Sequence, residues 1–120
     1  MYIYLMYSKE IIKGTLKPII LKLLQEEKRM YGYEITQKVK MLTANKIQIT
    51  EGALYPLLHK LEAEGSVTTE TEKIGKRIRK YYRLTPEGNT KAIELVDEFI
   101  DFMETMKSIL GTKPNYGTVK

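Results

Sequence analysis

Six basic residues stand within eleven positions of the chain, and no acidic residue interrupts them. They are Lys73, Lys76, Arg77, Arg79, Lys80 and Arg83. Lysines and arginines at this density can follow the phosphate backbone of a nucleic acid, and the arginines can enter a narrow minor groove. A solvated basic edge strand that discourages aggregation is the alternative. The first interpretation holds if a groove-reading helix lies beside this segment.

A second set of candidate contacts lies just upstream, on the segment 51–64. Four leucines at positions 54, 57, 58 and 61 have the i, i+3, i+4, i+7 spacing of a helix that buries one face. The remaining faces carry Gly52, Tyr55, His59 and Lys60, and Thr50 precedes the helix as its cap. Three glutamates offset Lys60, so we expect the basic segment and the helix start to supply affinity while few side chains read sequence.

The composition excludes most enzymatic chemistry. The chain has no cysteine and a single histidine, so thiolate nucleophiles, zinc–thiolate sites and iron–sulfur clusters are impossible. No calcium-loop spacing and no glycine-rich phosphate loop occurs. His59 is therefore interpreted as an exposed polar residue or phosphate contact, and we expect no catalytic residue, metal or cofactor.

Length and charge favour one small basic domain with an appendage. The 120 residues are 42% hydrophobic and 29% charged, with a formal net charge of +5. Residues 1–83 carry a net +7 and residues 84–120 a net −2, so the front part is the candidate nucleic-acid binder. No apolar run reaches about 18 residues and the N-terminus does not resemble a signal peptide, so we expect a cytoplasmic protein without membrane association.

The pattern of apolar residues and caps predicts the elements that position these side chains. Helices are expected over 15–27, 32–42 and 50–64, a strand over 66–71, a turn over 73–76 and a strand over 77–84. Thr15, Thr50 and Thr85 are the expected helix caps, and Pro56 should bend the third helix or shift its start. Residues 1–14 are either an extended arm or a short helical turn capped by Ser8.

The hairpin strand over 77–84 should have two distinct faces. Ile78, Tyr82 and Leu84 alternate with Arg77, Arg79, Tyr81 and Arg83, so the first three are expected to face the core.

The final helix, expected over 85–110, has the pattern of a dimer element. Its apolar residues are spaced 4, 3, 4, 3 and 4, as in the seam of a coiled coil: Ala92, Val96, Phe99, Met103, Met106 and Leu110. Further apolar residues flank the seam on both sides, so the face is wide enough for its own domain and a partner. We therefore expect a homodimer. The alternative is an amphipathic helix folded onto its own small core.

The predicted fold is mainly α with a small β-hairpin. It is a winged helix-turn-helix domain followed by a long C-terminal dimerisation helix. We divide the chain into an N-terminal arm and winged helix-turn-helix domain over 1–84, the dimerisation helix over 85–111, and a flexible tail over 112–120.

Several segments together resemble the PadR family of bacterial transcriptional regulators. They are Lys13-Gly14-Thr15-Leu16, the stretch from Met30 to Ile35 (MYGYEI), the stretch from Thr50 to Gly65 (TEGALYPLLHKLEAEG) and the stretch from Arg79 to Gly88 (RKYYRLTPEG). The resemblance implies a homodimeric winged-helix repressor whose third helix enters the major groove and whose hairpin lies against the backbone or minor groove. By position, it places Thr50, Gly52, Tyr55 and His59 in the recognition helix, and Lys76, Arg77 and Arg79 in the wing. It also implies that Pro56 is compatible with a helix.

The resemblance further implies a small aromatic or drug-like effector. Some members sandwich flat ligands between tryptophans of the dimer helices, and this chain has no tryptophan. Phe99, Phe102, Met103 and Met106 could line such a pocket, although aromatic and methionine residues at helical spacing are first of all core or seam residues. The resulting hypothesis is a ligand-responsive, homodimeric repressor that reads an inverted repeat in double-stranded DNA. The alternative is a winged-helix module that binds another protein.

Overall fold

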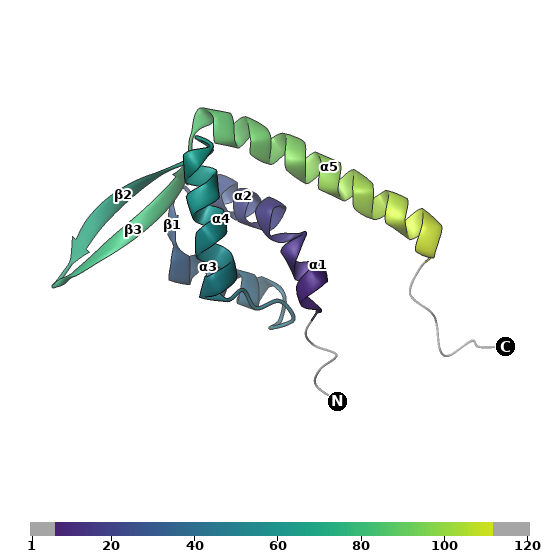
Figure 1. Ribbon diagram of the computed structural model, residues 1–120, viewed down its shortest axis with the longest axis horizontal. Helices are drawn as coiled ribbons and strands as arrows, with labels where there is room; N and C mark the ends of the chain where they lie inside the picture. The colour runs from purple at the N-terminus through teal and green to yellow at the C-terminus, as the bar shows by residue number, and fades with distance from the viewer. Residues whose placement is uncertain (1–6, 112–120) are drawn as a thin grey trace.

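A computed structural model describes residues 7–111, and it contains five helices and a three-stranded sheet in that range (Figure 1). The elements are α1 (Lys9–Lys13), α2 (Leu16–Glu26), β1 (Met30–Tyr31), α3 (Gly32–Leu42), α4 (Glu51–Ala63), β2 (Val67–Ile74), β3 (Arg77–Leu84) and α5 (Pro86–Leu110). The predicted fold class, a winged helix-turn-helix followed by a long C-terminal helix, is confirmed. The expected tail over 112–120 and residues 1–6 lie outside the described range.

The core lies where α2, α3 and α4 meet the base of the sheet. Its fully buried side chains recur at helical spacing on each helix, which is why these segments fold against one another. They include Ile20, Leu21, Ile35, Val39, Leu54, Leu58 and Leu61. Tyr82 of β3 and Ala92 of α5 close the core from the other side.

Three of the helix starts have the predicted side-chain caps. The hydroxyl oxygens of Ser8, Thr50 and Thr85 accept hydrogen bonds from the amides of the third helical residue at 3.4, 3.2 and 3.0 Å. Thr15 occupies the N-cap position of α2 as predicted, but it makes no side-chain cap, because its hydroxyl donates to the carbonyl of Ile12 at 2.9 Å. Thr15 therefore connects α2 to α1, and the predicted short helical turn capped by Ser8 is confirmed over Lys9–Lys13, while the part of the expected arm over residues 1–6 lies outside the described range.

The turn between α3 and α4 brings the two helices of the helix-turn-helix together. Ala44 and Asn45 both have positive φ angles, 51° and 68°, which reverse the chain direction after α3. α4 then begins at Glu51, so Pro56 does not shift its start. Pro56 is exposed and lacks an amide hydrogen, so the carbonyl of Gly52 has no donor one turn along the helix.

The hairpin is longer than predicted. Strand β2 continues to Ile74, and only Gly75 and Lys76 form the turn, with Ile74 opposite Arg77 in the register. Gly75 has φ +63°, as expected of glycine at the first central position of a two-residue type II′ turn. The predicted turn over 73–76 and the predicted strand end at Thr71 are therefore wrong.

The sheet contains one strand that the sequence did not indicate. β1 pairs antiparallel with β3, with Met30 opposite Tyr82 and Tyr31 opposite Tyr81. Tyr82 faces the core as predicted, whereas Ile78 is 69% exposed because the hairpin extends beyond the core. Tyr81, expected on the polar face, is only 8% exposed because Arg29 and Tyr31 cover it.

A tight junction fixes α5 to the turn after α4. The Thr85 hydroxyl donates to the carbonyl of Gly65 at 2.6 Å, and its amide donates to the carbonyl of Ser66 at 3.0 Å. Gly88 lies against that same Ser66 carbonyl, and a β-carbon at position 88 would collide with it. From this junction, α5 packs along α2 and runs away from the hairpin (Figure 1).

We expect Gly88→Ala to destabilise the protein by about 1–3 kcal/mol. The added methyl group would overlap the Ser66 carbonyl, and this backbone group cannot move aside without displacing the turn after α4. Urea unfolding measures the loss. Gly14→Ala is the matched control, since its β-carbon would meet nothing closer than the Ile11 carbonyl at 4.0 Å. A Gly88→Ala midpoint equal to that of the control would contradict the packing at this junction.

Candidate nucleic-acid interface

The outer faces of α4 carry the residues predicted to contact DNA. Leu54, Leu58 and Leu61 point into the core, and Gly52, His59 and Lys60 are exposed on the other faces. Thr50 is exposed as well, although its side-chain oxygen is engaged in capping α4. The helix therefore presents polar groups along its length to a ligand outside the core.

Tyr55 is half-buried and has a packing role that the sequence did not show. Its ring and hydroxyl lie against Gly32 at the start of α3, where a β-carbon would overlap them. Gly32 is thus required for Tyr55 to lie across the start of α3. This contact brings the MYGYEI and EGALYP segments together in space.

The six basic residues of the hairpin divide into two groups. Arg83 pairs with Glu70 at 3.0 Å, and Lys80 lies 3.9 Å from Glu62 of α4. Within residues 7–111, the other four form no ion pair: Lys73, Lys76, Arg77 and Arg79. These four, the wing cations, lie toward the tip of the hairpin, and their charge is available to an external anion.

One face of the hairpin holds an ion cluster centred on Arg29. Its guanidinium donates to Glu70 at 2.6 Å and to Glu72 at 3.0 Å. Hydrogen bonds from Arg29 and then from Arg83 hold the pKa of the Glu70 carboxyl below its ordinary value. Sequence reasoning missed Arg29, because its partners lie 41 and 43 residues away and no local pattern joins them.

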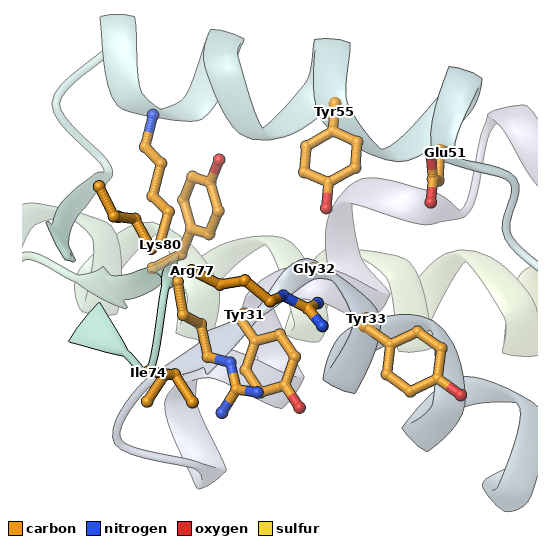
Figure 2. Close-up of a pocket in the computed structure, with 11 residues that line it drawn as sticks. Tyr31, Gly32, Tyr33, Glu51, Tyr55, Ile74, Arg77 and Lys80 are labelled. Atoms are coloured by element: carbon orange, nitrogen blue, oxygen red, sulfur yellow. The ribbon is translucent and has the colours of Figure 1, made fainter. Parts of the chain in front are cut away.

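A groove of about 660 Å³ lies between the hairpin, the start of α3 and α4. Figure 2 shows Tyr55 extending from α4 toward it, with Tyr31, Tyr33 and Arg77 on the other side. Of the predicted contacts, Tyr55, Arg77 and Arg79 line the groove. Its acidic lining residue is Glu51, so cationic and phenolic groups dominate its polar surface.

The remaining predicted contacts lie around this groove rather than in it. Thr50 and Gly52 flank Glu51 at the start of α4, Lys73 and Lys76 lie at the hairpin tip, and His59 and Lys60 lie further along α4. Tyr31 and Tyr33 line the groove from the start of α3, and Arg79 stacks on the Tyr31 ring at 4.1 Å. The groove and its surroundings can therefore accept an extended anion.

The predicted dimer residues are unevenly buried along α5. Ala92 is fully buried in the core of its own chain, so packing within the chain is sufficient to explain an apolar residue at this position. Val96, Phe99 and Met106 are half-buried, whereas Met103 and Leu110 are 44% and 73% exposed. Phe102, proposed for an effector pocket, is 54% exposed, and its ring centroid lies 6.4 Å from that of Phe99.

The described residues offer few other candidate sites. No group of three or more potential ligands places a metal site within residues 7–111. No helix in the same range has the length and apolar character needed to cross a membrane. A second, smaller cavity of about 220 Å³ lies between α2 and α5, and none of the four proposed effector residues lines it.

Comparison with known proteins assigns the family. The model of the transcriptional regulator PadR-like family matches residues 20–94. Uncharacterized protein X of Lysinibacillus sphaericus is 39% identical over 102 residues, which cover 82% of this chain and 91% of the relative. A transcriptional regulator structure from Clostridium thermocellum is 30% identical with a TM-score of 0.77, and covers 87% of this chain and 98% of its own. A PadR family regulator structure from Eggerthella lenta is 32% identical with a TM-score of 0.72, and covers 87% and 88%.

This chain belongs to the PadR-like family of transcriptional regulators. Members of the family are non-enzymatic regulators that bind DNA, and the prediction that the chain is not an enzyme is confirmed.

We expect Glu70→Gln to destabilise the protein near neutral pH and to match the wild type in strong acid. Because folding lowers the pKa of Glu70, its contribution to stability is present above the unfolded value, about 4.3, and is lost as the pH falls through the lower folded value. Urea midpoints of both proteins between neutral pH and about pH 2.5 test this.

The control for this experiment is Glu26→Gln, which removes only a surface pair with Lys22 at 3.5 Å. Its effect should be smaller than that of Glu70→Gln near neutral pH. A Glu70→Gln deficit that stays constant into strong acid would contradict the ion cluster.

Proposed function

We propose that this chain is a sequence-specific repressor that binds double-stranded DNA as a homodimer, reads an inverted repeat, and is released by a small aromatic or drug-like ligand. The family assignment supplies transcriptional regulation through DNA binding. Duplex binding is supported by the hairpin cations that are unpaired within residues 7–111 and the exposed groups of α4, and dimerisation by the exposed apolar surface of α5.

The observation that carries the proposal is the arrangement of the wing cations beside the start of α4. Lys73, Lys76, Arg77 and Arg79 are unpaired within the described residues, and they adjoin a groove whose other wall is the exposed start of α4. A duplex presents phosphates on both sides of its major groove. A helix in that groove and a basic hairpin on the adjoining backbone match this geometry.

The two parts of the surface should have different roles. The wing cations supply affinity that does not depend on sequence, because they contact phosphates. Exposed groups on α4, including Gly52, His59 and Lys60, are positioned to meet base edges or the flanking backbone. Tyr55 acts mainly by packing α4 against α3, with its hydroxyl at the groove.

Dimerisation is supported by the uncovered apolar face of α5. The helix has 25 residues and extends about 37 Å, yet none of its described residues on the C-terminal side of Ala92 is fully buried. The large apolar side chains that are at least 44% exposed are Ile93, Ile100, Phe102, Met103, Ile109 and Leu110. Burying six such side chains at about 1.5–3 kcal/mol each gives a gross term on the order of 10 kcal/mol per helix.

A two-fold dimer would place its two α4 helices on successive turns of one face of the duplex, about 34 Å apart. It would therefore read an inverted repeat, and a dimer bound over a promoter blocks transcription from it. A ligand seated among Phe99, Phe102, Met103 and Met106 would change how the α5 helices pack and so change that spacing. A regulator of this kind acts in the cytoplasm, where bacterial DNA lies.

The competing function is a winged-helix module whose basic hairpin binds an acidic protein. Selection of bound fragments from genomic DNA, at moderate ionic strength and with random competitor DNA, separates the two. The repressor enriches fragments that share an inverted repeat. The protein-binding module enriches none.

We expect Arg77→Ala and Arg79→Ala each to weaken binding to the selected fragment and to flatten its salt dependence. Loss of one phosphate contact should reduce the slope of log K against log salt by about 1. Lys91→Ala removes the same charge from α5, away from the hairpin, and should leave the slope unchanged. Slopes of both arginine variants equal to the wild-type slope would rule out the wing contact.

We expect the wild-type protein to have twice the mass of one chain by light scattering at micromolar concentration, and Met103→Glu to have the mass of one chain. A carboxylate at this exposed apolar position could not be buried between two helices without a partner. Thr105→Glu adds the same charge at an exposed position outside the predicted seam and should stay dimeric. A wild-type protein that is monomeric would overturn the dimer.

A further inference from the structure

Two tyrosines on the outer face of the sheet contact each other, and each carries an arginine on its ring. The Arg29 guanidinium lies 3.7 Å from the centroid of the Tyr81 ring, and the Arg79 guanidinium lies 4.1 Å from that of the Tyr31 ring. The two tyrosine rings meet edge to face, with centroids 5.5 Å apart and planes at 84°. We call these four side chains, Arg29, Tyr81, Tyr31 and Arg79, the Arg–Tyr ladder.

The two ends of the ladder differ in their ionic partners. Arg29 is held by the carboxylates of Glu70 and Glu72, at 2.6 and 3.0 Å. Arg79 forms no ion pair within the described residues, and its guanidinium donates to the Tyr81 hydroxyl at 3.4 Å. One end is therefore fixed in the fold, while the other is oriented and still carries an uncompensated charge.

The register of the hairpin shows why Arg79 has no ionic partner among the described residues while Arg29 has two. Glu72 lies directly opposite Arg79 across the β2–β3 pair, so it is the acid best placed to neutralise Arg79. The carboxylate of Glu72 instead bonds Arg29. Arg29 therefore leaves Arg79 without a cross-strand carboxylate partner.

The Tyr31 ring completes the arrangement from the other side. An arginine side chain has many rotamers, and holding it on a ring before binding reduces the freedom that it loses on contact with a ligand. Arg79 and Tyr31 both line the groove beside α4. Arg77, by contrast, has no ring within stacking distance among the described aromatic contacts.

We propose that Arg29 and Tyr31 are positioning residues for DNA binding: Arg29 draws Glu72 away from Arg79, and Tyr31 orients the Arg79 guanidinium toward a backbone phosphate at the groove. Neither residue needs to touch the DNA. The inference rests on the proposed DNA-binding function and adds the residues that prepare one of its phosphate contacts.

The orientation of Arg79 can be tested without DNA. In the NMR spectrum of the free protein, the Nε–Hε signal of Arg79 should be shifted upfield by the ring current of Tyr31. Tyr31→Phe keeps the ring and should keep the shift, whereas Tyr31→Leu should abolish it. A shift that survives Tyr31→Leu would overturn the stacking, and the melting temperature of each variant reports whether it folds.

The effect on binding is measured by a double-mutant cycle on the selected DNA fragment. Tyr31→Leu should weaken binding about two- to fivefold, the size expected of an exposed cation–π contact, while Tyr31→Phe stays close to wild type. The cost of Tyr31→Leu should vanish in an Arg79→Ala background and persist in an Arg77→Ala background. Equal costs in both backgrounds would show that Tyr31 does not act through Arg79.

Arg29 has its own rescue experiment, which does not depend on the Tyr31 variants folding. Arg29→Gln should weaken binding because Glu72 becomes free to pair with Arg79, and adding Glu72→Gln should restore it. Glu72→Gln alone is the control for the change in net charge, and it should strengthen binding less than it does in the Arg29→Gln background. Failure of the rescue would overturn the role of Arg29. Failure of the wild-type protein to prefer any fragment would instead overturn the proposed function itself.

Discussion

The position of α5 relative to the winged-helix elements depends on the junction at which Gly88 approaches the Ser66 carbonyl, and the packing of α5 along α2 continues from this junction. Thr85 brings this contact about, because its amide and hydroxyl bind the turn after α4 while its hydroxyl oxygen also caps α5. The same residues therefore end the winged-helix unit and start the long helix. In the proposed dimer, this junction and the packing of α5 on α2 would set the spacing between the two α4 helices, so a small rotation here would be amplified along a helix of 25 residues.

The charges of the hairpin are divided between holding the fold and facing a partner. On β2, Glu70 and Glu72 engage Arg29, and Glu70 also engages Arg83 of β3, so these charges compensate one another. Toward the tip, the wing cations have no carboxylate partner within the described residues. Surface ion pairs contribute little stability individually, but they decide which cations keep an uncompensated charge. The acidic residues on β2 therefore help to select the cations that remain available for phosphate.

Local sequence signals were sufficient for the parts of the fold that local forces determine. Leucine spacing and the threonine caps located α4 and α5, because both signals operate within one or two turns of helix. Strand β1 could not be found in this way, since its two residues pair with Tyr81 and Tyr82 about fifty positions later. For the same reason, sequence could not separate Lys80 and Arg83 from the four wing cations. Their pairing depends on acids that only the folded register brings within reach.

The unpredicted strand β1 also explains how the hairpin, α3 and α4 form one body. Tyr31 pairs with β3 of the hairpin, while its amide donates to Glu34 in the first turn of α3 at 3.1 Å. The next residue, Gly32, receives the Tyr55 side chain of α4. Three successive contacts thus join the hairpin, α3 and α4 through two adjacent residues. A ligand bound at α5 would therefore change the shape of this unit very little. In the proposed dimer, such a ligand would act by changing the distance between two of these units, because α5 joins each of them at the Gly88 junction and along α2.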